Sequence, residues 1–214
     1  MRGDAGSGNG PAMRILAIET ATEACSVALF DGDRCIGAFH ETIGRGHAER
    51  LVPMIAQLPD KGRAEQIRVS LGPGSFTGVR IGIATANALG VAWQAEVLGY
   101  PTLALLARMG IEDERAPVTV CMNAGHGEWF VQNFAADGTA QDSLRSIAPE
   151  AATHNVHSRI VGNRARELAE ATGGTASPPD LPDARAVPLL ATDQLIADVR
   201  PHYGRAPDAK LPSR

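Results

Sequence analysis

Short hydrophobic runs separated by a few polar residues dominate the start of the chain, and this pattern predicts strands. The runs at 14–20, 24–30 and 34–41 are joined by short turns, which is typical of an antiparallel meander of three strands. The next hydrophobic positions, within 46–58, recur every three or four residues, which predicts an amphipathic helix. The hydrophobic period therefore changes from that of a strand to that of a helix after the third run.

The stretch from Ser70 to Gln94, SLGPGSFTGVRIGIATANALGVAWQ, predicts a strand end, a glycine-rich loop and a long helix. Glycine and proline break the strand, and Ser75 or Thr77 can then serve as the N-cap by accepting a hydrogen bond from a free backbone N–H. An alanine-rich segment without proline follows. The other segments are most easily understood as neighbours of this helix.

Further strands are expected on either side of the long helix, at 66–71 and 96–100, and a short helix at 102–109. Three antiparallel strands followed by alternating helices and strands predict an α/β layer of ribonuclease-H-like type. The acidic, proline-bounded stretch at 111–117 is a reasonable domain junction.

A second meander is expected beyond this junction, followed by two helices. The stretch at 173–184, GGTASPPDLPDA, shows no packing pattern and is interpreted as a loop. The predicted elements are strands at 118–122, 128–134, 143–147 and 159–162, and helices at 164–171 and 187–200.

Small residues recur at every fourth position of the long helix, at Gly78, Gly82, Ala86 and Gly90, so one face of the helix carries almost no side chain. Glycine costs about 1 kcal/mol per helical position relative to alanine, so this face needs a compensating close approach of another backbone. Two interpretations remain open. The face can lie against the chain's own sheet, or it can receive a helix of a partner protein.

Composition and charge limit the classes of function. The chain has 214 residues, 44% of them hydrophobic, and a net charge of −4, which argues against strong nonspecific binding of nucleic acid by this chain alone. Cys25, Cys35 and Cys121 are far apart and form no CxxC pair, so they are expected to be reduced core thiols. The first residues lack the apolar region of a signal peptide, and we expect a cytoplasmic protein with no membrane segment.

Candidate catalytic and ligand-binding groups are sparse. The ETAT loop at 19–22 could donate hydrogen bonds to phosphate, but no lysine lies near it, and the GPGS loop lacks the Walker spacing. Ser75 is not in a GxSxG elbow, and His154 and His157 do not have the spacing of a zincin. The sequence therefore predicts no catalytic residue, no cofactor and no metal site.

Three segments together support a family resemblance. RILAIETAT, GHAERLVPMI and GPGSFTGVRIGIATANAL resemble the bacterial TsaB family, a subunit of the tRNA threonylcarbamoyladenosine machinery. The resemblance covers residues 13–107 well and continues weakly through 123–134 and 201–210. It implies an actin-like (ASKHA) fold with two related lobes, the second one reduced, and kinship to TsaD, the catalytic subunit. The chain lacks the helical HxxxH metal pair of that relative.

The resemblance implies that the chain functions as a noncatalytic scaffold. The chain would bind and organise TsaD as a heterodimer, TsaE would join through the complex, and tRNA would be bound only by the complex. A homodimer is possible when TsaD is absent. The first-lobe helices would form the partner interface, with these residues: His47, Arg50, Leu51, Met54, Gly78, Val79, Gly82, Ile83, Ala86 and Gly90.

Some positions depart from the family pattern. Glu19 stands where aspartate is common, and Asn123 and Gly125 stand where the family usually carries the acid and arginine of DARxGE. The rival interpretations are an actin-like enzyme, either an ATP-dependent phosphotransferase or a glycoprotease-like peptidase, and direct tRNA binding by the C-terminal cations. Those cations are Arg200, Arg205, Lys210 and Arg214.

The chain is predicted to divide into four parts. They are a flexible N-terminal extension at 1–12, a ribonuclease-H-like lobe at 13–110, a reduced C-terminal lobe at 111–200 and a surface tail at 201–214.

Overall fold

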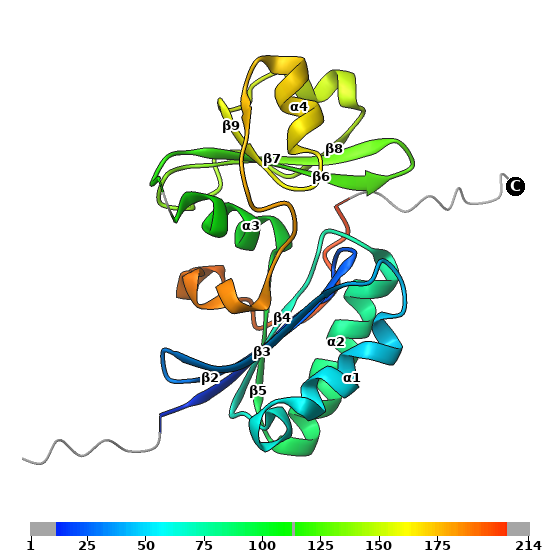
Figure 1. The fold of residues 1–214 in the computed structure, drawn as a ribbon, viewed down its shortest axis with the longest axis vertical. Helices are drawn as coiled ribbons and strands as arrows, with labels where there is room; N and C mark the ends of the chain where they lie inside the picture. Colours follow the sequence, from blue (N-terminus) through cyan, green and yellow to red (C-terminus); the bar gives the residue numbers. More distant parts are fainter. Residues whose placement is uncertain (1–11, 113, 205–214) are drawn as a thin grey trace, which may run out of the picture.

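The computed structural model describes residues 12–112 and 114–204, which form two five-stranded sheets stacked along the long axis of the molecule (Figure 1). The first sheet has the strand order β3-β2-β1-β4-β5. Strands β1 to β3 are antiparallel, whereas β4 and β5 run parallel to β1. The strands are β1 (Arg14–Glu19), β2 (Ala24–Asp31), β3 (Arg34–Thr42), β4 (Gln66–Ser70) and β5 (Glu96–Tyr100).

Two helices cover one face of the first sheet, and a third lies between the two sheets (Figure 1). Helices α1 (His47–Gln57) and α2 (Phe76–Trp93) lie side by side on the outer face. Helix α3 (Thr102–Ile111) contributes to a core shared with residues of both sheets. The predicted βββαβα order and its ribonuclease-H-like topology are confirmed.

The second sheet is smaller and has the order β10-β9-β6-β7-β8. Helix α4 (Ala165–Thr172) covers its outer face (Figure 1). The predicted second meander is present, and two similar sheet-and-helix lobes joined in one chain are the actin-like architecture expected from the resemblance. The strands are β6 (Val118–Gly125), β7 (Glu128–Phe134), β8 (Arg145–Ile147), β9 (Arg159–Val161) and β10 (Thr175–Ala176), the last inside the segment predicted as a loop.

The helix predicted over 187–200 is wrong. This part of the chain holds the short 3-10 helices η3 (Ala184–Leu189) and η4 (Thr192–Gln194) and otherwise extended backbone. Pro188 cannot donate a helical hydrogen bond, and the backbone of Ile196 instead exchanges two hydrogen bonds with Gly99 of β5, at 2.7 and 2.8 Å. The chain therefore returns to the first sheet within the range predicted for the second lobe. Two further 3-10 helices are η1 (Pro59–Gly62) and η2 (Pro149–Thr153).

Helix α2 begins where the sequence predicts. Ser75 is the N-cap, and its hydroxyl accepts a hydrogen bond from the Gly78 N–H at 3.2 Å. The helix runs for 18 residues and ends where Gln94 adopts a left-handed conformation, with φ 56°. Of the two N-caps considered, Ser75 is confirmed.

The glycine face of α2 lies on the chain's own sheet. A Cβ at Gly78 would come within 3.0 Å of the Thr20 carbonyl oxygen, and one at Gly82 would come as close to the Thr20 hydroxyl. At the other end of the helix, a Cβ at Gly90 would meet the side chain of Val97. The interpretation of this strip as an open partner surface is therefore wrong, because Thr20 after β1 and Val97 of β5 already cover it.

The other residues expected in a partner interface are mostly core residues as well. Leu51, Met54, Val79 and Ile83 belong to the hydrophobic cluster between the helices and the sheet, and Ala86 is fully buried there too. His47 is 4% exposed and hydrogen-bonds to the Ala24 carbonyl oxygen at 3.2 Å. Arg50 is half-buried and forms a bidentate ion pair with Glu41 of β3, so it alone of the ten is partly accessible.

Two of the three cysteines are core thiols as expected, and the third is not. Burial raises the pKa of Cys25 to about 11 and that of Cys121 to about 12, so both are unreactive. Cys35 is exposed on β3, the edge strand. The predicted N-terminal extension, apart from Ala12, and most of the tail lie outside the described residues. No helix in the described part of the chain has the length and hydropathy needed to cross a membrane.

We predict that Gly82→Leu destabilises the fold. The leucine side chain must displace Thr20, whose hydroxyl donates to the Gly78 carbonyl oxygen at 2.8 Å. We therefore expect the unfolding free energy, measured in denaturant titrations, to fall by about 1–3 kcal/mol or more. The control is Ala92→Leu on the exposed side of α2, which should change stability by less than about 0.5 kcal/mol. Equal stability of Gly82→Leu and the wild type would contradict this account of the strip.

Candidate functional site

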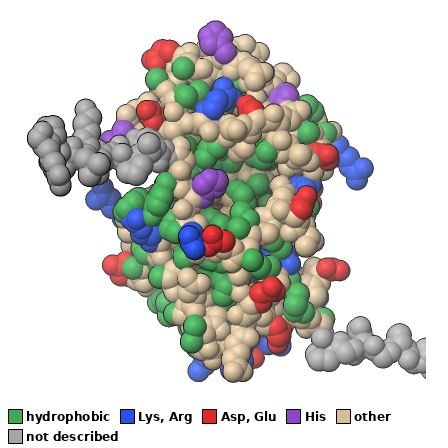
Figure 2. Space-filling view, turned by 180° about the vertical axis from the view of Figure 1, so that it is seen from behind, with side chains coloured by type: hydrophobic (Ala, Val, Ile, Leu, Met, Phe, Trp, Pro, Cys, Tyr) green, Lys and Arg blue, Asp and Glu red, His purple; other side chains and the backbone are tan. Residues whose placement is uncertain are grey.

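A cavity of about 700 Å³ lies between the two lobes. In the view from behind, hydrophobic side chains gather at mid-height of the molecule, along the boundary between the two lobes (Figure 2). Loops form most of the cavity wall, and Val79 and Arg80 of α2, Met122 of β6 and Phe130 of β7 complete it. Its lining comes from the β1–β2 loop at 21–23, the loop before α2 at 74–76, the β6–β7 turn at 123–126, Asn163, and the C-terminal residues 202–204.

The topology brings the two loops singled out in the sequence to one place. Strands β1 and β4 are parallel neighbours, so the loops after them leave the same edge of the sheet. The backbone N–H of Ser75 donates to the Ala21 carbonyl oxygen at 2.7 Å, and the Thr20 hydroxyl donates to the Gly78 carbonyl oxygen at 2.8 Å. The ETAT loop and the GPGS loop are therefore joined directly at the cavity wall.

A hydrogen-bonded link crosses from one lobe to the other beside the cavity. The Asn163 amide donates to both carboxylate oxygens of Glu23, at 3.1 and 3.3 Å. Its Oδ1 accepts from the backbone N–H of Asn123 at 2.8 Å, and the Asn123 side chain in turn accepts from Gly125 N at 3.1 Å. Asn123 and Gly125, two of the three positions that depart from the family pattern, thus shape the second-lobe wall. No pattern in the sequence indicates the pair Glu23 and Asn163, which are 140 residues apart.

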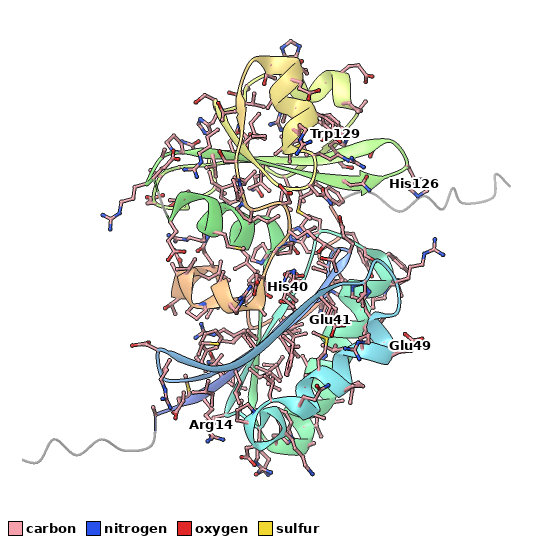
Figure 3. All side chains as sticks on the ribbon, viewed as in Figure 1. Arg14, His40, Glu41, Glu49, His126 and Trp129 are labelled. Carbon is pink, nitrogen blue, oxygen red and sulfur yellow. The ribbon has the colours of Figure 1, made fainter. Side chains whose placement is uncertain are left out.

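The tip of the β6–β7 turn projects to the side of the second lobe, where Figure 3 labels His126. His126 adopts a left-handed conformation, with φ 54°, between two glycines that also have positive φ. The cavity lining contains His126, His202, Arg80 of α2 and the carboxylate of Glu23.

Glu19 lies beneath the cavity and is fully buried. Its Oε1 accepts from the Ala21 N–H at 2.7 Å, and the hydroxyl of Tyr100 lies 3.3 Å from its Oε2. Burial raises the pKa of Glu19 to about 7, because the apolar surroundings disfavour the carboxylate, while bonds from Ala21, Ser70 and Tyr100 partly offset this. A carboxyl group that titrates near neutral pH therefore lies inside the first lobe.

The hydroxyl groups expected as phosphate ligands already have partners in the fold. Thr20 donates to the Gly78 carbonyl oxygen, and the Thr22 hydroxyl accepts from the Ala24 N–H at 3.2 Å. Ser75, considered above as a nucleophile, caps α2. The ring of His157 hydrogen-bonds to Gln141 at 2.6 Å and lies away from the cavity lining. In the described ranges, no group of three or more His, Cys, Asp or Glu side chains is placed to hold a metal ion.

The outer face of α1 and α2 is a second candidate site. It exposes small and medium apolar side chains at Val52, Ala84, Ala88 and Val91, of which Val91 is 84% and Val52 55% exposed. Figure 3 labels Glu49, an exposed residue of α1. We call this outer face the helix-pair surface. The sequence of α2 indicates this surface, because the helix contains one charged residue in 18 and is therefore apolar on two sides.

Comparisons with known proteins support the family. The family model described as "TsaD: tRNA N6-adenosine threonylcarbamoyltransferase" matches residues 35–178, more than half of the chain. The tRNA threonylcarbamoyladenosine biosynthesis protein TsaB of Escherichia coli (strain K12) is 38% identical over 131 residues, which is 58% of this chain and 56% of that protein. TsaB of Haemophilus influenzae is 34% identical over 61% and 57% of the two chains.

Solved structures agree with the sequence relatives. An uncharacterized protein with similarity to peptidase YEAZ from Pseudomonas aeruginosa superimposes with a TM-score of 0.77 at 28% identity, covering 90% of this chain and 100% of that one. YeaZ from Pseudomonas aeruginosa gives 0.76 at 29% identity, covering 89% and 99%. The chain spans about half the length of the curated relatives that it matches.

The fold and the matched model define a protein of the actin-like class related to tRNA N6-adenosine threonylcarbamoyltransferase. Within this class the chain belongs to the TsaB family, which confirms the resemblance seen in the sequence.

We predict that Glu19 makes the stability of the protein depend on pH. Its folded pKa of about 7 is above its ordinary value of 4.5, so the folded state binds the proton more tightly. The unfolding free energy should fall as pH rises from about 4.5 to 7, by on the order of 3 kcal/mol. Glu19→Gln should flatten this slope in denaturant titrations at several pH values. An unchanged slope, or the same flattening in the exposed control Glu170→Gln, would contradict the assignment.

Proposed function

We propose that the chain is a noncatalytic scaffold subunit that binds TsaD and organises it for threonylcarbamoyl transfer to the tRNA adenosine next to the anticodon. The observation that carries the proposal is the helix-pair surface, an exposed apolar face on two adjacent helices. The names of the relatives, tRNA threonylcarbamoyladenosine biosynthesis proteins, support the pathway.

The helix-pair surface has the properties of a helix-packing interface. Alanine at positions 84 and 88 allows a partner helix to approach α2 closely, and Val52 and Val91 provide apolar area at the two sides. The rim is charged, with Glu49 of α1 and Arg80 of α2. Exposed apolar side chains that recur on one face of a protein ordinarily mark a surface that a partner covers.

The kind of partner follows from the family model. A model built for TsaD matches this chain from residue 35 to 178, a range that includes both α1 and α2. TsaD is therefore expected to carry a corresponding helix pair, and two such pairs can pack as a four-helix arrangement. A second copy of this chain would offer the same surface, so a homodimer is the expected state without TsaD. TsaE and tRNA would join through the complex, in the cytoplasm.

The interlobe cavity favours a second candidate, an actin-like enzyme. Its volume of about 700 Å³ is large enough for a nucleotide, which an ATP-dependent phosphotransferase would require, and the likeness to a structure described by similarity to a peptidase gives the glycoprotease-like alternative. Calorimetry with ATP and magnesium separates the candidates, since tight binding by the isolated chain would favour the phosphotransferase. For direct tRNA binding, Arg200 is exposed and paired with Asp198 at 2.9 Å, and the other three cations lie outside the described residues.

We predict that Ala88→Glu weakens TsaD binding by more than about tenfold, because it places an unpaired charge in the middle of the interface. The measurement is the affinity of purified TsaD for immobilised chain. The matched control is Ala171→Glu, an exposed helical alanine on α4 of the second lobe. Gly82→Leu does not test this interface, because that residue faces the sheet.

Both variants keep the fold if their unfolding curves match the wild type, which makes the comparison specific to the surface. Wild-type affinity of Ala88→Glu for TsaD would overturn the helix-pair surface as the binding site, and equal weakening by Ala171→Glu would show that the surface is not selective.

A further inference from the structure

The last described residues, 201–204, cross the boundary between the two lobes, and we call them the strap. Upstream of them the chain is held on β5, where Ile196 and Gly99 exchange two backbone hydrogen bonds. The strap itself is attached by the His202 N–H, which donates to the Leu71 carbonyl oxygen at 2.7 Å. Gly204 then reaches the second lobe, where a Cβ would come within 3.0 Å of the Phe130 ring.

The strap is the wall shared by two cavities. A second cavity of about 660 Å³ lies between α3, β7, the turn at 138–144 and the segment at 191–196. Three residues line both this cavity and the interlobe cavity, and these are His202, Tyr203 and Gly204. Removing the strap would therefore join the two cavities into one groove along the lobe boundary.

The outer anchor of the strap is a cluster of three exposed side chains. The ring of Tyr203 stacks on that of Phe76 with centroids 5.7 Å apart, and the two side chains are 49% and 61% exposed. The Arg80 guanidinium lies 3.3 Å from the centroid of the Phe76 ring and also donates to the Tyr203 hydroxyl. Aromatic and cation–π contacts at exposed sites are individually weak, so this anchor can open without unfolding the lobe.

The anchor residue Arg80 also lies on the helix-pair surface. Arg80, Ala84, Ala88 and Val91 are spaced by four, four and three residues along α2, and all four are exposed on one side of the helix. A protein that covers this surface would meet the Arg80 side chain at its rim. Contacts made by this partner protein would compete with Tyr203 for the Arg80 guanidinium.

We propose that the strap is a displaceable partition between the two cavities, held by Arg80, and that a partner bound on the helix-pair surface releases it. The first part stands on the strap contacts alone, whereas the second part rests on the proposed binding of TsaD. The two cavities are then separate in the free chain and joined in the complex. Contact on the outside of α2 is thereby coupled to the cavity between the lobes.

Amide hydrogen exchange, measured by NMR on the full chain, tests the partition. Tyr203→Ala and Arg80→Ala should each raise the exchange rate of the His202 amide about tenfold, while the Gly99 and Ile196 amides keep their rates. Tyr203→Phe keeps the stacking and should have a smaller effect, and Arg166→Ala on α4 should have none. An unchanged exchange rate of the His202 amide in both Tyr203→Ala and Arg80→Ala would overturn the proposal that this anchor holds the strap.

The same measurement with saturating TsaD tests the coupling. The His202 amide of the wild type should exchange about tenfold faster in the complex, and Tyr203→Ala should show no further increase. If TsaD binds and the His202 rate stays the same or falls, the coupling is wrong and the scaffold function stands. If TsaD does not bind the wild-type chain, the scaffold function and the coupling both fail, and the experiment on the free chain still decides the partition.

Discussion

The close approach of α2 to the end of β1 is the constraint on which the rest of the structure depends. The Thr20 hydroxyl donates to the Gly78 carbonyl oxygen, and Gly82 leaves the space that this hydroxyl occupies. The contact holds the loop after β1 against the loop before α2, and these two loops form the first-lobe wall of the interlobe cavity. It also turns the opposite side of α2 outward. The buried glycine face and the exposed alanine face are two results of one packing arrangement.

Most of the regular elements were predictable because hydrophobic spacing determines them locally, as the Ser75 cap and the 18 residues of α2 show. The group that packs against the glycine strip could not be predicted, because a strip of small residues indicates a close approach but does not identify the approaching group. Here that group is Thr20, 58 residues from Gly78. The interface residues chosen from the sequence were therefore mostly core residues, and the outer face of the same helices was missed. The link between Glu23 and Asn163 depends on tertiary structure in the same way.

The two lobes are held together by contacts of different strength. Helix α3 lies in a continuous hydrophobic core with both sheets, which gives a firm connection. The Asn163–Glu23 link and the strap are polar or exposed, and they lie at the rim of the cavity. Glu19 adds a titrating carboxyl group at the base of the first-lobe loops. A firm centre with weak contacts at the rim allows the loops to respond to a partner while the fold is kept.

The central claim is that the exposed face of α1 and α2 is where TsaD binds, and site-specific photo-cross-linking tests it most directly. A photoreactive amino acid at position 91, where the valine is 84% exposed, should capture TsaD in the assembled complex, and the same group at position 171 of α4 should not. Capture from position 171 with none from position 91 would contradict the account.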